Sequence, residues 1–121
     1  VALLEDGRLR VLRAWPQGRP LGLDAVACDP AAWPWVAVLA NHAGADGREV
    51  RALLNAGVRG LVVAGTGNGS LSAALEAALA DAAREVPVRR CSRCADGAVI
   101  DAPGALLPSA GERSPWQARV D

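Results

Sequence analysis

The residues with the clearest chemical potential lie in the stretch Gly65-Thr66-Gly67-Asn68-Gly69-Ser70. Glycines let a backbone approach a ligand closely, and the Asn68 amide and the Ser70 hydroxyl can both form hydrogen bonds with it. The stretch lies between a predicted strand and a predicted helix, which is where open α/β sheets bind ligands. Because a helix N-terminus favours anions, a carboxylate or a phosphate would fit here.

The same stretch allows two other interpretations. It is not a Walker A loop, because the chain has no lysine, and its glycine spacing differs from the G-x-G-x-x-G of dinucleotide-binding domains. Nucleotide binding is therefore less favoured than binding of a small carboxylate. The structural alternative is a tight turn in which Ser70 caps the following helix.

Cysteine and histidine residues offer further candidates. Cys91 and Cys94 have the spacing of a redox pair or of half a zinc site, with Cys28 and His42 as conceivable additional ligands. No helix pattern follows Cys94, however, as it would in a thioredoxin-like motif, so incidental thiols are favoured and no metal is expected. For His42, capping or bridging its own loop near Asp46 is favoured over ligand contact. No Ser/His/Asp motif is visible, so a complete nucleophilic site is not expected in this chain.

Regular elements that could position the glycine loop alternate along the second part of the chain. Short apolar runs predict strands, and apolar residues at helical spacing predict helices between them. The predicted strands cover 35–40, 59–65 and 86–94, and the predicted helices cover 46–57 and 70–85, with Gly57 ending the first helix. Ser114-Pro115 is typical of a helix start. This order predicts an α/β fold with helices flanking a parallel sheet in three layers, similar to a Rossmann fold.

The first part of the chain has a different pattern. Asp6-Gly7 between short apolar runs predicts a β-hairpin over residues 1–13. Residues 15–34 contain many prolines and glycines and are expected to form a linker. Since an isolated hairpin is only marginally stable, we expect residues 1–32 to be the end of an upstream domain plus a linker. Residues 33–121 are then an α/β domain that is truncated at its last helix.

Composition narrows the classes of function. The 121 residues carry 13 basic and 13 acidic side chains, and this balance argues against electrostatic capture of nucleic acid or of a membrane surface. No apolar run is long enough to cross a bilayer. Three cysteines are too few for a disulfide scaffold, so a reducing compartment and a cytoplasmic location are expected.

The segment Gly57–Ser70, GVRGLVVAGTGNGS, strongly resembles the C-terminal domain of bacterial-type L-asparaginases. Two later segments support the resemblance. Val86–Arg93 is similar to that family's strand ending in Arg-Ser-Ser-Arg, and Ser114–Val120 is similar to the family's final Pro-x-x-Ala-Arg helix start. The resemblance covers about residues 33–121.

The resemblance implies part of a two-domain amidohydrolase that converts L-asparagine to L-aspartate and ammonia without a cofactor. The catalytic threonines would lie in an N-terminal domain, so this chain would hold no catalytic residue and be inactive alone. The C-terminal domain would lend substrate-binding residues to a neighbouring subunit in a homodimer or homotetramer. By this resemblance Asn68 and Ser70 are the substrate-binding residues, with Asn68 shaping the loop and Ser70 contacting substrate.

One departure concerns specificity. Well-studied family members carry a Glu after the Arg-Ser-Ser-Arg strand, which contacts the substrate amine, whereas residues 98–104 contain none. Whether Asp101 replaces that Glu stays open, and so does the preference for asparagine or glutamine. The alternative function, from another class, is a non-catalytic domain that binds a small carboxylate through the glycine loop.

Overall fold

The computed structural model describes residues 2–12, 14, 17, 22–95 and 97–120. The chain forms two compact units, Val1–Trp33 and Pro34–Asp121. In the described ranges, no helix has both the length and the apolar character that a membrane span requires.

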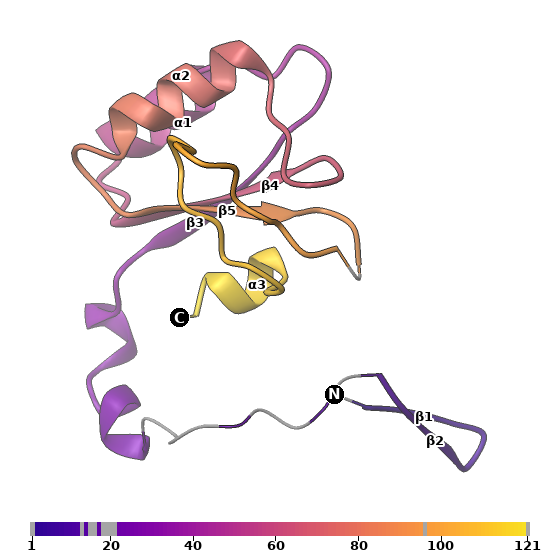
Figure 1. Cartoon of the computed structure of the whole chain (residues 1–121). Helices are drawn as coiled ribbons and strands as arrows, with labels where there is room; N and C mark the ends of the chain where they lie inside the picture. Colours follow the sequence, from indigo (N-terminus) through magenta and orange to yellow (C-terminus); the bar gives the residue numbers. More distant parts are fainter. Residues whose placement is uncertain (1, 13, 15–16, 18–21, 96, 121) are drawn as a thin grey trace. The chain divides into compact units, whose positions relative to one another are not determined.

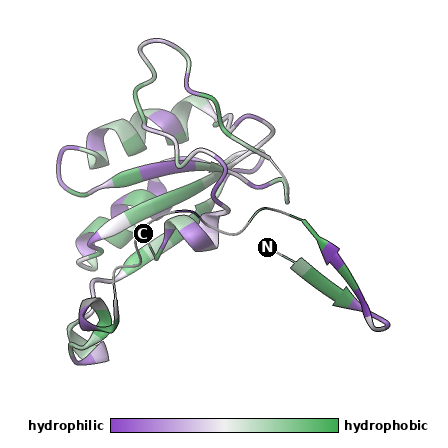
Figure 2. Ribbon diagram, turned by 60° about the horizontal axis from the view of Figure 1, so that its bottom comes forward, coloured by the Kyte–Doolittle hydropathy of each residue, from purple (hydrophilic) through white to green (hydrophobic). Residues whose placement is uncertain are grey.

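The first unit begins with the predicted hairpin. Strands β1 (Ala2–Glu5) and β2 (Arg8–Val11) pair antiparallel. Asp6 and Gly7 both have positive φ, 48° and 73°, as a two-residue type I′ turn requires. Figure 2 shows hydrophobic residues on both strands, and the large ones are solvent-exposed.

The predicted linker holds only short turns among its described residues. They are two 3₁₀ helices, η1 (Leu23–Val26) and η2 (Pro30–Ala32), and the Asp29 carboxylate accepts a hydrogen bond from the Ala31 amide at the start of η2. Residues 1, 13, 15–16 and 18–21 of the predicted hairpin and linker lie outside the described residues. The assignment of residues 1–32 to an upstream domain remains a prediction.

The second unit is built on a three-stranded parallel sheet. Its order is β3 (Val36–Ala40), β4 (Gly60–Gly65), β5 (Val88–Ser92), so β4 is central. The predicted parallel sheet is confirmed. Every residue of β4 is buried, as expected for a strand that is covered on both faces.

Helices cover both faces of this sheet (Figure 1), which confirms the three-layer fold. Helices α1 (Arg48–Asn55) and α2 (Ala73–Ala82) lie on one face, and the short α3 (Pro115–Ala118) lies on the other. Each helix carries hydrophobic and hydrophilic residues (Figure 2), because only one side of it faces the sheet. The larger core, on the face of α1 and α2, includes Leu61, Leu75 and Leu79.

The end of α1 and the start of α3 follow the sequence prediction, but the start of α2 does not. Gly57, at φ 84°, and Val58 donate to the Leu54 and Leu53 carbonyls, which ends α1 in a Schellman motif. Ser114 and Gln117 form a capping box at the start of α3. Ser70 does not cap α2, however, because its main chain is paired with Thr66 inside the loop. The cap is supplied two residues later by Ser72.

Candidate functional site

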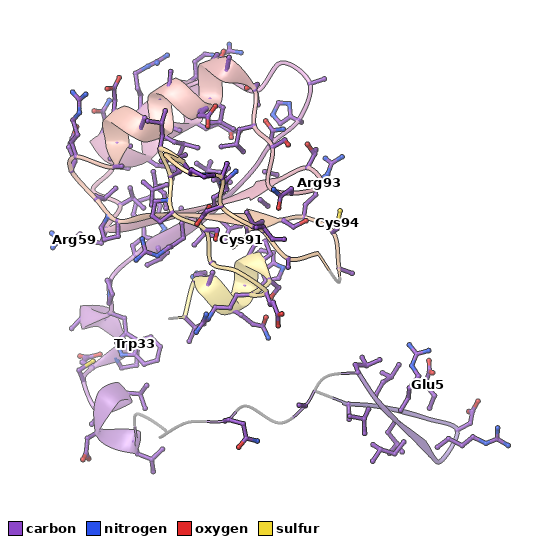
Figure 3. The ribbon with its side chains drawn as sticks, viewed as in Figure 1. Glu5, Trp33, Arg59, Cys91, Arg93 and Cys94 are labelled. Carbon is purple, nitrogen blue, oxygen red and sulfur yellow. The ribbon has the colours of Figure 1, made fainter. Side chains whose placement is uncertain are left out.

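The glycine loop, residues 65–70, follows β4 at the carboxyl edge of the parallel sheet. Figure 3 shows Arg93 and Cys94 at this same edge, just after β5, whereas Arg59 lies at the opposite edge, just before β4. The loop is therefore where the fold class places ligand sites. A cavity of about 880 Å³ lies by the opposite edge and is lined by Arg59, Arg89 and Ala118 among others, but it contains none of the predicted site residues.

Hydrogen bonds within the loop close it into a tight turn. The Thr66 amide donates to the Ser70 carbonyl at 3.0 Å, and the Ser70 amide donates to the Thr66 carbonyl at 2.8 Å. A Cβ placed on Gly65 would lie only 2.4 Å from the Gly69 carbonyl carbon. Gly65 is therefore needed because of this close approach of two backbone segments.

The Asn41 amide holds one flank of the loop. Asn41 is 8% exposed and comes directly after β3. Its Nδ2 donates to the Ser70 carbonyl at 3.2 Å, and its Oδ1 accepts from the Ser72 amide at 3.1 Å. The amide thus joins the end of β3 to the last residue of the loop and to the N-cap of α2.

The end of β5 also holds the loop. The buried Ser92 hydroxyl donates to the Gly67 carbonyl at 2.7 Å and accepts from the Cys94 amide at 3.1 Å. The Arg93 amide donates to the Gly65 carbonyl at 2.8 Å. The loop is therefore tied to both neighbours of β4, and its conformation is determined by the sheet beneath it.

The Asn68 side chain makes a structural contact through both ends of its amide. Its Nδ2 donates to the Ile100 carbonyl at 3.0 Å, and its Oδ1 accepts from the Ile100 amide at 2.8 Å. Next to Ile100, the buried Val99 side chain lies over Gly69. The Asn68 amide therefore joins the loop to the main chain of Ile100. Its role as a substrate-binding residue remains a prediction.

The Ser70 side chain is free, unlike its main chain. The residue is exposed, and within the described part of the chain its hydroxyl makes no hydrogen bond. A hydroxyl can donate one hydrogen bond and accept two, so Ser70 can bind an ammonium, an amide or a carboxylate group. Of the two predicted site residues, it is the one whose side chain makes no hydrogen bond within the described part of the chain.

Asp101, which stands where an acidic substrate contact was sought, is engaged internally. Its carboxylate accepts from the Ser109 amide at 3.1 Å and from Arg90 Nη2 at 2.7 Å. The Ser109 amide, and after it the Arg90 guanidinium, hold the pKa of Asp101 below its ordinary value. These contacts give Asp101 a role in holding residues 99–101 near β5.

The other candidates of the sequence analysis make only local contacts. Cys91 is buried, and burial raises the pKa of its thiol, which lowers its reactivity. Cys28 and Cys94 are exposed, and no group of three metal-ligating side chains comes together among the described residues. His42 Nδ1 lies 2.9 Å from the Ala43 carbonyl in its own loop.

Sequence reasoning missed Asn41 and Ser92 as residues of the site. A signal for Asn41 existed, because it is a polar residue directly after an apolar strand, at the edge where the loop was expected. Ser92 gave no such signal, because it lies inside a predicted strand and its partner Gly67 is a residue of the loop 25 positions away.

Comparisons with known proteins concern the family and the fold of the chain. Residues 35–120 match the family model described as the glutaminase/asparaginase C-terminal domain. No curated protein sequence matches the chain. Among solved structures, the fold is similar to that of a probable cytoplasmic L-asparaginase from Campylobacter jejuni, with a TM-score of 0.76 and 24% identity. The match covers 98% of this chain and 40% of that protein, so the chain spans less than half of its length.

Proposed function

The chain belongs to the glutaminase/asparaginase family, of which it carries the C-terminal domain, and from this we propose that it is part of an L-asparaginase. The proposed reaction is the hydrolysis of L-asparagine to L-aspartate and ammonia. The observation that carries the site assignment is the exposed Ser70 hydroxyl, which is free of hydrogen bonds in the described structure while Asn41 and Ser92 hold the loop around it.

The proposed division of labour places the chemistry outside this chain. The catalytic nucleophile belongs to an N-terminal domain, and Ser70 contributes a substrate contact to the active site of a neighbouring subunit in a homodimer or homotetramer. Residues 1–32 then belong to the end of the N-terminal domain and the linker. A cytoplasmic location is part of the same proposal.

A rigid loop suits this role. A substrate contact contributes most when its position is set before binding, because no ordering cost is then subtracted from the binding energy. The loop carbonyls of Gly65, Thr66, Gly67 and Ser70 all accept hydrogen bonds, so the backbone that carries the Ser70 hydroxyl is held in one arrangement.

The second candidate function is a non-catalytic domain that binds a small carboxylate. One observation favours it. The Arg93 guanidinium lies at the same edge as the glycine loop, with Nη1 3.3 Å from the Asn41 carbonyl, and so adds a positive charge at this edge. The two functions differ in whether ammonia is released.

The deciding experiment measures ammonia release from L-asparagine. It compares the 121-residue chain with the protein encoded by the full reading frame that contains it. Release by the longer protein alone is expected. If neither releases ammonia but the chain binds L-aspartate, the carboxylate-binding function replaces this proposal, and release by the chain alone would show that the nucleophile lies within residues 1–121. L-glutamine as a parallel substrate measures the preference between the two amides.

A further inference from the structure

We infer that Asn41 is a positioning residue for the substrate contact made by Ser70, and that it acts through the Ser70 main-chain carbonyl. This inference rests on the proposed function. The Asn41 side chain is directed at the loop main chain and is mostly buried, so it is not itself offered as a catalytic residue.

Three groups donate hydrogen bonds to the Ser70 carbonyl. The Thr66 amide and the Thr66 hydroxyl donate to it at 3.0 and 3.3 Å, and Asn41 Nδ2 donates at 3.2 Å. Both Thr66 groups belong to the loop and would move with it. Of these donors, Asn41 alone lies outside the loop, so it ties the residue that bears the hydroxyl to the sheet.

The Asn41 side-chain amide is itself held in one orientation. Its Oδ1 accepts from the Ser72 amide, so the two ends of the amide group bind the residues on either side of Leu71. An amide held at both ends has a fixed plane. In a buried position water competes weakly for these hydrogen bonds, so each contributes more than it would at the surface.

The Asn41 backbone is anchored to β4 and to the residue that follows β5. Its amide donates to the Ala64 carbonyl at 2.9 Å, and its carbonyl accepts from Arg93 Nη1 at 3.3 Å. The hydrogen bonds of Asn41 therefore run from β4 and the end of β5 to Ser70. A displacement of Asn41 would be passed to the Ser70 main chain.

The test separates the two hydrogen bonds of the amide. Asn41→Asp keeps an oxygen acceptor for the Ser72 amide, but it replaces the donor to Ser70 with an oxygen that faces the Ser70 carbonyl oxygen. Ser72→Ala is the matched control, because it removes the cap of α2 and leaves the donors on the Ser70 carbonyl in place. Asn41→Ala is the uncharged second variant, for use if Asn41→Asp does not fold.

The readout is a double-mutant cycle on kcat/KM for L-asparagine, in the protein encoded by the full reading frame. We expect Ser70→Ala and Asn41→Asp each to lower kcat/KM about tenfold, the effect of losing one hydrogen bond to substrate. We expect kcat/KM of the double variant to be no lower than that of the less active single variant, because the two substitutions remove the same substrate contact. Ser72→Ala is expected to change kcat/KM less than twofold.

Two results would overturn the inference. One is a loss of kcat/KM in the double variant equal to the product of the two single losses, and the other is a loss of kcat/KM in Ser72→Ala equal to that in Asn41→Asp. A second measurement does not depend on the proposed function. Hydrogen exchange of residues 66–72 should be faster in Asn41→Asp than in Ser72→Ala, and equal rates would also overturn the inference. If Ser70→Ala keeps full activity while exchange responds to Asn41→Asp, the substrate role of Ser70 fails and the positioning of the loop stands.

Discussion

Two asparagine amides hold the glycine loop, one at the Asn41 flank beside β3 and one at the Asn68 flank beside Ile100, and they have different surroundings. Asn41 is buried and joins Ser70 and Ser72, which lead into a regular helix. Asn68 is exposed and joins the loop to Ile100, which belongs to an irregular segment. The same side chain with the same pair of hydrogen bonds therefore has two different consequences.

Burial explains the difference. Removing a buried amide leaves its partners without water to replace it, whereas the partners of an exposed amide are solvated again. The Asn41 flank should thus determine the stability and position of the loop, while the Asn68 flank should determine how firmly residues 97–101 lie against it.

The largest effect is expected at Gly65, where the loop leaves the sheet between the two flanks. In Gly65→Ala the new Cβ would overlap the Gly69 backbone, with 2.4 Å to its carbonyl carbon. We expect the free energy of unfolding to fall by about 3 kcal/mol, as in severe overpacking, in urea denaturation. Gly67→Ala is the control, because its Cβ would meet open space at φ 51° and should cost only about 1 kcal/mol. Equal losses would contradict the close-approach argument.

The next effect separates the flanks directly. Asn41→Leu removes the acceptor of the Ser72 amide and one of the donors to the Ser70 carbonyl, both at a buried position. We expect a loss of about 2 kcal/mol in the free energy of unfolding, measured by urea denaturation. A loss no larger than that of Asn68→Ala would remove the distinction between a buried and an exposed flank.

Asn68→Ala should have the smaller effect of the two amides. It removes both hydrogen bonds to Ile100, but water replaces them at an exposed site, so we expect a loss of about 1 kcal/mol. Hydrogen exchange at Ile100 should become faster while exchange at Ser70 stays unchanged. Faster exchange at both positions would show that the flanks do not act separately.

The Asn68 flank also has a predicted pH dependence through Asp101. The pKa of Asp101 is lower in the folded chain than its ordinary value because of the Ser109 amide and Arg90, so the folded state favours the ionised form. Its contribution to stability is present above the ordinary value of 3.8 and is lost as the pH falls below it. Asp101→Asn should therefore show a smaller loss of stability between about pH 5 and pH 2 than the parent chain in acid denaturation. An identical pH profile would contradict this.

The smallest effect on stability is expected at Ser70 itself. Its exposed hydroxyl holds no structural hydrogen bond among the described residues, so Ser70→Ala should change the free energy of unfolding by less than about 0.5 kcal/mol. A loss above about 1 kcal/mol would give the hydroxyl a structural role that the geometry does not contain.

Local residues made much of the fold predictable. Asp6-Gly7 specified the hairpin turn, Gly57 specified the end of α1, and Ser114 specified the start of α3. Each acts through backbone conformations or hydrogen bonds within a few residues. The start of α2 was placed wrongly because Ser70 and Ser72 are equally good caps in a local view, and pairing with Thr66 in the loop decides between them.

The sequence by itself determined the types of the elements, their parallel arrangement and the place of the glycine loop, because these follow from periodicity and from turn residues. Only the tertiary structure decided which side chains hold the loop and which remains free. Asn41 and Ser70 are 29 positions apart, and Asn68 and Ile100 are 32 apart. Such pairs depend on the register of neighbouring strands and on the path of the segment after β5, which no local pattern encodes.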